Sequence, residues 1–308
     1  MKKALSCCFF ILCFLLLNSA QPAFSQPNPP VIDFASDTQD PLWVEKIFLT
    51  ANRNAEATRM IFGDITQRHP AALFVLGDVV ALGFENRKWK NIDAYLKALK
   101  NTSVPVYAAL GNHELMFDAS KGMRKFQSRF PMHKSTGYVE IIDSVAVILL
   151  NSNFSKMLPG EIQKQDIWYK NTLQQLETDN EVKFVLVGCH HSPYTNSTIV
   201  SPSLLVRDKF VAPFLKSKKC VLFLSGHSHN FEHFVVEGKQ FLVIGGGGGI
   251  HQPVYTGIGR LRTNDLSGNY KPMFHYVEVK RIRDSLQVTS RQLKTDFSGF
   301  TDGLRFRF

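Results

Sequence analysis

The stretch Val221–His229 reads VLFLSGHSH and contains the pattern that decides the fold. An apolar run of this length, closed by a glycine, is typical of a buried strand. Residues just past such a strand project from the carboxyl edge of the sheet, where open α/β sheets bind ligands. His227 and His229 follow the turn at Gly226, so we expect that both imidazoles can reach a metal at that edge.

Four predicted strands upstream end in the same way, with polar side chains directly after an apolar run. These ends are FASDTQ with Asp37 and Gln39, FVLGD with Asp78, YAALGNHE with Asn112 and His113, and VLVGCHH with His190 and His191. The carboxyl ends of parallel strands meet at one edge of a sheet. Together the five ends therefore predict a single shared site.

Strands and helices alternate over the first two thirds of the chain. Strands are predicted at 31–36, 71–76, 104–110, 182–188 and 219–224, with helices within 42–68 and at 88–99, 161–176 and 203–215. A hairpin is predicted within 137–150, and residues 230–308 are β-rich, with hairpins around 237–238 and 283–285. This pattern predicts an α/β sandwich of two sheets with helices outside, in one domain spanning 26–308.

The N-terminus has the pattern of a secretory signal. Two lysines precede the apolar run 4–17, and small residues follow at 23–25. The run has about 14 residues, and a membrane span needs about 20. We expect residues 1–25 to be a signal peptide cleaved after Ser25, or else after Ala20. The protein is then secreted or periplasmic, and it is held at a membrane only if the signal is retained.

The chain is basic, with a formal net charge of +10 that becomes +8 once Lys2 and Lys3 leave with the signal. A basic protein concentrates anions near its surface. The charge alone does not separate a phosphate ester from nucleic acid or an anionic membrane. No aromatic–basic stripe of the kind that stacks single strands is present, so we predict no specific nucleic-acid binding.

Two cysteines, Cys189 and Cys220, lie outside the signal. One ends a predicted strand and the other begins the next, so parallel pairing separates the thiols by over about 10 Å. We predict two free thiols.

The polar strand ends offer carboxylate oxygens, an amide oxygen and imidazole nitrogens. This mixture suits Mn, Fe, Zn or Co rather than calcium or a thiolate-bound metal. One carboxylate can bridge two metal ions about 3.5–4 Å apart. Such a pair binds a phosphoryl oxygen and lowers the pKa of a bound water.

In order and in spacing, the five motifs resemble those of the calcineurin-like metallophosphoesterases, which include purple acid phosphatases and bacterial phosphodiesterases. The family pattern is D-x-H, G-D, G-N-H-D/E, H-x-P or H-H-P-P, and G-H-x-H. It stands here at 37–39, 77–78, 111–114, 190–193 and 226–229, within the core 33–229. The resemblance implies a four-layer α/β/β/α sandwich of two mixed β-sheets flanked by helices, with two divalent or trivalent metal ions.

The resemblance also implies a role for each motif residue. Asp78 would bridge the two metals and take part in catalysis, and His113 would contact the phosphate and protonate the leaving oxygen. One metal would be bound by Asp37, Gln39 and His229, and the other by Asn112, His227 and a histidine of the pair His190/His191. Substrate contacts are implied for Asn112, His113 and His191.

Two positions depart from the family pattern or leave it open. Gln39 stands where the pattern has histidine, and a glutamine carbonyl is a weaker metal ligand than imidazole. Alignment with H-H-P-P members makes His190 the metal ligand, whereas alignment with H-S-P members makes it His191. We favour His190 and place the other histidine near the phosphate.

The resemblance implies an exported binuclear metal enzyme that hydrolyses phosphate esters by attack of a metal-bound hydroxide. We favour a monoesterase of the acid-phosphatase type acting on a phosphorylated small molecule, because HHSPYTNS and the export signal resemble those members. One alternative is a phosphodiesterase with the same site. Another is a catalytically impaired homologue that binds a phosphate ligand, as Gln39 suggests.

Two further segments are open to two interpretations each. The run Gly245–Gly249 is a tight loop at the same edge or a cradle whose N–H groups bind phosphate. The basic stretch Lys121–Phe130 shapes specificity beside the site or is a solvated helix.

Overall fold

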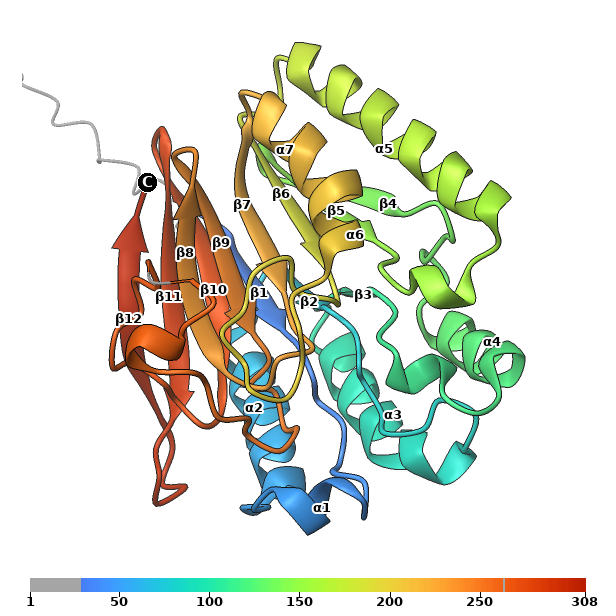
Figure 1. The fold of residues 1–308 in the computed structure, drawn as a ribbon, viewed down its shortest axis with the longest axis vertical. Helices are drawn as coiled ribbons and strands as arrows, with labels where there is room; N and C mark the ends of the chain where they lie inside the picture. Colours follow the sequence, from blue (N-terminus) through green and yellow to red (C-terminus); the bar gives the residue numbers. More distant parts are fainter. Residues whose placement is uncertain (1–28, 263) are drawn as a thin grey trace, which may run out of the picture.

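The computed structural model describes residues 29–262 and 264–308, which form two six-stranded β-sheets (Figure 1). The first sheet has the order β12-β11-β10-β1-β2-β3 and the second the order β4-β5-β6-β7-β9-β8. The first comprises β1 (Val31–Ala35), β2 (Ala72–Val75), β3 (Val106–Ala108), β10 (His275–Ile282), β11 (Ser285–Leu293) and β12 (Phe300–Arg307). The second comprises β4 (Tyr138–Ile142), β5 (Val145–Leu150), β6 (Phe184–Cys189), β7 (Cys220–Ser225), β8 (Phe231–Val236) and β9 (Lys239–Ile244).

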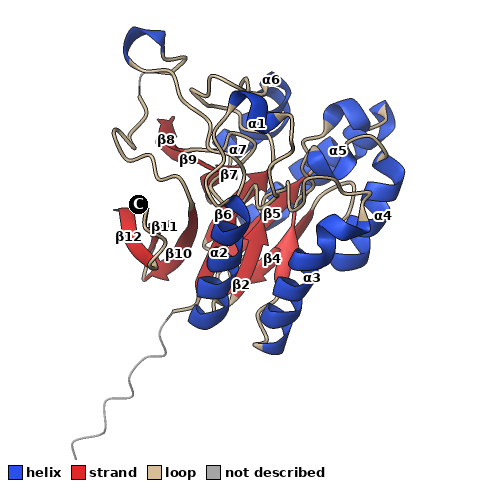
Figure 2. Cartoon of the chain, turned by 90° about the horizontal axis from the view of Figure 1, so that it is seen from below, coloured by secondary structure: helices blue, strands red, loops and turns tan. Residues whose placement is uncertain are grey.

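Helices cover the outer faces of both sheets, and Figure 2 shows the sheets between them. The first sheet carries α2 (Asn54–Arg68), α3 (Asn86–Asn101) and α4 (Ala119–Arg129). The second carries α5 (Pro159–Thr178) and a continuous helical stretch formed by α6 (Leu204–Val206), the π-turn Arg207–Val211 and α7 (Ala212–Lys216). The short helix α1 (Glu45–Phe48) and the 3-10 turns His113–Leu115, Phe154–Lys156 and Gly257–Gly259 lie in connections. The predicted four-layer sandwich is confirmed.

Three apolar cores hold the four layers together. Between the sheets lie residues such as Phe34 and Leu222, and their strand neighbours face the helices instead. On β7, for example, Leu222 and Leu224 face the other sheet while Phe223 packs among the residues of α7. Strands buried on both faces need an uninterrupted apolar run, which is why VLFL contains no polar residue.

The central strands of both sheets are parallel, and this positions the site. β1, β2 and β3 run parallel, as do β5, β6, β7 and β9. The loops that follow β1, β2, β3, β6 and β7 carry the predicted site residues, and they meet where the carboxyl edges of the two sheets adjoin.

The sequence-based element boundaries agree with the structure within a few residues, but β12 was missed. Its sequence FTDGLRFR contains a glycine and exposed polar residues, so it lacks a clear alternation. The strand forms because it pairs with β11 at the edge of the first sheet. Local pattern alone does not reveal such tertiary pairing.

Cys189 and Cys220 are both free and buried, as predicted. Burial raises the pKa of the Cys220 thiol to about 12 and raises that of Cys189 further. Both thiols are therefore inert at neutral pH. Among the residues that the structure describes, no helix is long and apolar enough to cross a membrane. The predicted signal peptide, residues 1–25, lies outside them.

Candidate metal centre

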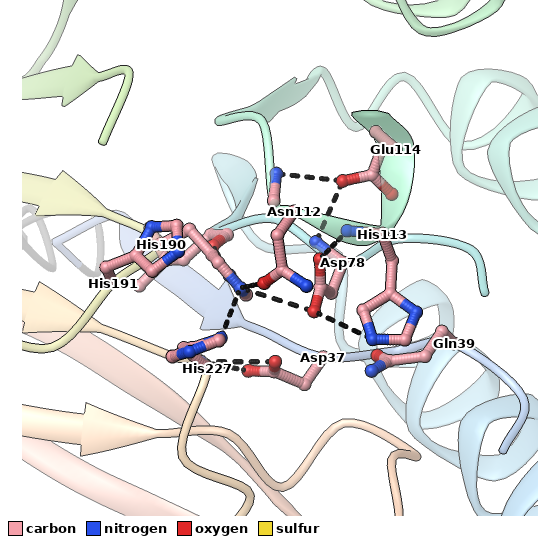
Figure 3. Close-up of polar contacts among 12 residues, drawn as sticks. Asp37, Gln39, Asp78, Asn112, His113, Glu114, His190, His191 and His227 are labelled. Carbon is pink, nitrogen blue, oxygen red and sulfur yellow. Dashed lines mark hydrogen bonds and ion pairs between the residues drawn. The ribbon is translucent and has the colours of Figure 1, made fainter. Parts of the chain in front are cut away.

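The loops after five parallel strands bring the predicted site residues together, as Figure 3 shows. Two groups of three side chains place their ligand atoms within 4.8 Å of one another. One group is Asp78, His190 and His227, and the other is Asp37, Asp78 and His229. Asp78 belongs to both groups, so one carboxylate stands between two potential cation sites.

Backbone carbonyls orient two of the imidazoles. Nδ1 of His190 lies 3.0 Å from the carbonyl oxygen of Leu76, and Nδ1 of His229 lies 2.8 Å from that of Ile250. Each Nδ1 must donate its hydrogen to the carbonyl, which leaves Nε2 with a lone pair in the neutral ring. This second contact is typical of metal-binding histidines.

The free Nε2 atoms face other acceptors. Nε2 of His190 lies 3.0 Å from Oδ1 of Asn112 and 3.2 Å from Oδ2 of Asp78. Nε2 of His229 lies 3.3 Å from Oδ1 of Asp37. The lone pairs of these nitrogen and oxygen atoms repel one another unless a proton or a cation lies between them. The donor set therefore fits two metal ions of the borderline class that binds carboxylate and imidazole.

The pKa shifts of these residues also indicate that the site favours positive charge. Burial alone would lower the pKa of His190, but the Asp78 carboxylate outweighs it and raises that pKa to about 9. Burial opposes a raised pKa at His229 as well, and the hydrogen bond to Asp37 overcomes it. Burial would raise the pKa of Asp78, yet its histidine neighbours lower it. Protons on these imidazoles thus supply charge that a cation would supply.

Three of the grouped residues have left-handed backbone conformations. The φ angles are 58° at Asp37, 49° at Asp78 and 66° at His227. Such angles are uncommon outside glycine, although Asp and His adopt them more readily than most residues. Strain of this kind is held at functional sites by the surrounding structure. Here it turns each side chain sharply out of the end of its strand.

His113 and Glu114 lie beside Asp78 on the short turn after β3 (Figure 3). The backbone N–H of His113 donates to Oδ1 of Asp78 over 2.8 Å, and its Nε2 lies 3.8 Å from Oδ2. The Glu114 carboxylate accepts hydrogen bonds from the N–H groups of Asp78, Val80 and Gly111. Glu114 therefore organises the loops rather than facing a ligand.

Comparison with protein families identifies this arrangement. A family model described as calcineurin-like phosphoesterase matches residues 30–231, well over half of the chain. The chain belongs to the calcineurin-like phosphoesterase family. Membership places it among the hydrolases of phosphoric esters, and the two ligand groups indicate metal dependence. A search of curated proteins gave no match.

Solved structures share the fold of this phosphoesterase at low sequence identity. A purple acid phosphatase from yellow lupin (Lupinus luteus) has a TM-score of 0.69 and 15% identity over 92% of this chain. The chain spans only 54% of that protein. GAP50, described as the anchor in the inner membrane complex of Plasmodium, has a TM-score of 0.62 and 13% identity, covering 91% of this chain and 89% of its own. A dimetal phosphatase from Danio rerio has a TM-score of 0.55 and 12% identity, covering 89% of this chain and 98% of its own.

His190 and His191, which are adjacent in the sequence, differ in their relation to the two ligand groups. His190 is fully buried within the first ligand group. His191 lies outside both groups, and its Nδ1 is 2.8 Å from Oγ of Ser152, which also accepts the His191 backbone N–H. Burial and the neighbouring His190 lower the pKa of His191 to about 3, so its ring is neutral.

Gln39 lies in the place that the family motif gives to histidine. Its Nε2 lies 3.3 Å from Nε2 of His229, while its Oε1 is buried without a partner among the described residues. Rotation of the amide by 180° exchanges these two atoms, and would direct the oxygen toward the second ligand group.

The glycine run packs against the frame of the metal centre. Three of its five N–H groups donate to backbone carbonyls: Gly245 to Asn230, Gly247 to Ser36 and Gly249 to Asp37. These bonds favour the tight loop over the phosphate cradle. The run packs against the loop that follows β1. A Cβ atom at any of its five glycines would lie too close to neighbouring atoms.

Sequence reasoning missed two residues that hold this glycine run. Nδ2 of Asn54 donates to the carbonyls of Gly248 and Gly249, and Oγ1 of Thr58 donates to that of Gly247. Both lie on α2 without a recognisable motif. The glycine run was the one sequence feature that pointed to such residues. The carbonyls of closely packed glycines are buried and need hydrogen-bond donors nearby.

Proposed function

We propose that this chain is an exported phosphomonoesterase with two metal ions at the shared edge of its sheets. One observation carries the proposal: two groups of ligand atoms converge with Asp78 common to both. Asp37, Asp78 and His229, with Gln39, would hold one ion, and Asp78, Asn112, His190 and His227 would hold the other. When bound, the ions would activate a water for attack on phosphorus and offset the charge of the phosphoryl oxygens.

His113 is the residue that we assign to proton transfer. Its Nδ1 lies 2.9 Å from the carbonyl oxygen of Ala81. A carbonyl oxygen can only accept, so Nδ1 carries a hydrogen and donates it to this oxygen. Nε2 is therefore the ring atom left to carry a proton to the substrate, and it lies 3.8 Å from Oδ2 of Asp78. Delivery of that proton to the leaving oxygen completes hydrolysis without releasing an alkoxide.

His191 and Asn112 are assigned to phosphate binding. The Ser152 hydroxyl accepts the His191 backbone N–H, and we assign its own hydrogen to Nδ1 of that ring. Nε2 of the neutral His191 ring then carries the hydrogen and donates it to a phosphate oxygen. Asn112 is partly exposed and offers its Nδ2 hydrogens while Oδ1 faces His190.

Support for the finer parts of the proposal comes from likeness and from sequence. The fold is similar to that of a purple acid phosphatase, and the segment HHSPYTNS resembles that class. Both likenesses support a monoester substrate. The basic residues and apolar run at the start of the sequence support export to the periplasm or the exterior. A phosphodiesterase with the same site is the alternative within hydrolysis.

Gln39 favours a second candidate from another class, a homologue that binds a phosphate ligand with little turnover. Its weaker oxygen replaces the imidazole of the family pattern in one ligand group. GAP50, a protein of similar fold, is described as an anchor. Against this candidate, a binder has no use for a proton donor such as His113.

The proposed function is tested with residues 26–308 and the paired substrates p-nitrophenyl phosphate and bis(p-nitrophenyl) phosphate. The protein is chelated, then assayed after addition of Mn, Zn, Fe or Co, with Asp78→Asn as the blank. We expect metal-restored hydrolysis of the monoester that Asp78→Asn lacks.

Faster hydrolysis of the diester would replace the monoesterase by the phosphodiesterase. Folded protein that binds metal but hydrolyses neither ester would overturn the hydrolase and support the binding homologue. The export proposal is tested separately, by fractionating cells that express residues 1–308 and sequencing the N-terminus of the product. Retention of the unprocessed chain in the cytoplasm would overturn it.

A further inference from the structure

A cavity of about 340 Å³ lies between α4 and the loop that joins β5 to α5. Apolar and cationic side chains line it together: Leu115, Met123, Arg124, Lys156 and Met157. The volume is at the small end of the range of ligand pockets. A larger cavity of about 810 Å³ between α5 and α7 is lined by none of the candidate site residues.

The two loops that wall this cavity also carry parts of the metal centre. Asn112 and His113 lie three and two residues before the wall residue Leu115, and Ser152, which contacts His191, directly follows the wall residue Asn151. Nδ2 of Asn153 donates to the carbonyl of Leu110 over 3.0 Å and ties the loops together. The cavity and the metal centre are therefore built on the same two loops.

Arg124 differs from the other basic residues of α4. Lys125 contacts Asn86, Arg129 forms a two-bond pair with Asp93, and Lys121 lies over the ring of Phe84 at 5.9 Å. Arg124 lines the cavity without an acidic or hydrogen-bonding partner in 29–262 and 264–308. A guanidinium in this state offers both N–H edges to an anion.

Lys156 brings a second positive charge to the opposite wall. Its ammonium group also has no side-chain partner within the described part of the chain, and it lines the same cavity. The one carboxylate in the lining, Glu161, accepts the backbone N–H of Leu158 at the start of α5. The lining is therefore net positive, and it combines apolar side chains with the polar residues Ser120, Ser135 and Asn151.

We propose, building on the phosphoesterase function above, that this cavity binds the leaving group of the substrate. The group that fits is an alcohol or phenol with an apolar body and a second anionic group, a carboxylate or phosphate. Its ester oxygen lies toward His113, the apolar body contacts Met123 and Met157, and the anion pairs with Arg124 and Lys156.

The test uses a matched pair of aryl phosphates, one with a para propionate and the other with the uncharged propionamide. We expect the wild-type kcat/KM to favour the propionate about fivefold to tenfold, an effect typical of one or two ion pairs. Arg124→Gln and Lys156→Gln should each remove most of that preference and leave kcat/KM for phenyl phosphate unchanged. Lys121→Gln, which removes the same charge from the same helix outside this cavity, should retain the preference.

A second readout separates this inference from the function on which it rests. Binding of the corresponding benzylphosphonates is measured by calorimetry, which needs no turnover. An Arg124-dependent preference for the propionate phosphonate supports the cavity even if no ester is hydrolysed. The cavity proposal is overturned by equal affinities for the two phosphonates, or by a loss of preference in Lys121→Gln that equals the loss in Arg124→Gln.

Discussion

Gly249 lies directly against the imidazole of His229. A Cβ atom at position 249 would lie 2.6 Å from both Cε1 and Nδ1 of that ring, closer than real Cβ contacts. The next residue, Ile250, accepts the hydrogen bond from the same Nδ1. The backbone of the glycine run thus fixes both the position and the tautomer of one proposed metal ligand.

Gly249→Ala should weaken the binding of one metal ion. The methyl group must displace the His229 ring from its bond to Ile250, and loss of such supporting contacts costs about 10–100-fold in metal affinity. Calorimetric titration of the chelated protein with Zn or Mn measures the two sites separately. Gly259→Ala is the control, since the nearest atom to its Cβ is 3.8 Å away. Unchanged affinity at both sites in Gly249→Ala would exclude this positioning role.

Glu114→Gln should destabilise the protein, because its carboxylate holds the backbone of the surrounding loops. The carboxylate accepts three backbone N–H groups at 2.8–3.1 Å, and an amide presents a donor to at least one of them. An unsatisfied buried group costs about 1–3 kcal/mol. Urea unfolding of the chelated protein measures the loss. Glu161→Gln, which disturbs one exposed bond to Leu158, should cost less. Equal losses in the two variants would contradict the account.

The position of the site followed from the sequence because the motif residues follow strands. A parallel strand gives its end residues a common edge, so Asp37, Asp78 and His227 were expected together from their order alone. The division into two ligand groups sharing Asp78 matches what the family resemblance implied. The choice between His190 and His191 needed the structure, since both are polar and both rings lie close to that of His227, with centroids 5.0 and 4.5 Å away.

Other features depended on contacts across long sequence separations. Asn54 donates hydrogen bonds to the carbonyls of Gly248 and Gly249. These residues follow it by 194 and 195 positions in the sequence. Arg124 differs from Arg129 because Asp93 and Trp89 on α3 contact the latter. No periodicity in α4 separates these two arginines, so the basic stretch could be noticed but not interpreted.

Gln39→His should tighten the binding of one metal ion. The Gln39 side chain already reaches to 3.3 Å from Nε2 of His229, so an imidazole at this position can face the same ligand group. Imidazole is a stronger ligand than a carbonyl oxygen for Zn and related ions. We expect about tenfold higher affinity at one site, about 1.4 kcal/mol, by competition with a chromogenic chelator.

The same variant separates the two candidate functions. If the weak ligand limits turnover, Gln39→His raises the phosphomonoesterase rate at low metal concentration and leaves the rate at saturating metal within a few-fold. Tighter metal binding with no hydrolysis at any concentration would favour the binding homologue. Unchanged metal affinity would show that Gln39 does not face the ion.

Asp33 on β1 is a buried carboxyl whose two oxygens have no hydrogen-bond partner in the described residues. Burial raises its pKa well above the ordinary value of 3.8, and Glu278, its cross-strand neighbour on β10, adds to the rise. Asp64 on α2 raises it further, whereas Arg68 on α2 and Arg291 on β11 lower it. Tyr276 on β10 also faces this group and donates to Asp64 over 2.6 Å.

Stability should therefore fall as the pH rises above 3.8, the ordinary pKa, toward the raised pKa of folded Asp33. The folded chain binds more protons than the unfolded chain in that range, so deprotonation favours unfolding. Asp33→Asn mimics the protonated form: it should match the wild type near pH 4 and exceed it at neutral pH, by about 1.4 kcal/mol for each pKa unit of the shift. Urea unfolding of the chelated proteins across this pH range measures the difference. A difference independent of pH would mean that Asp33 is not protonated in the folded chain.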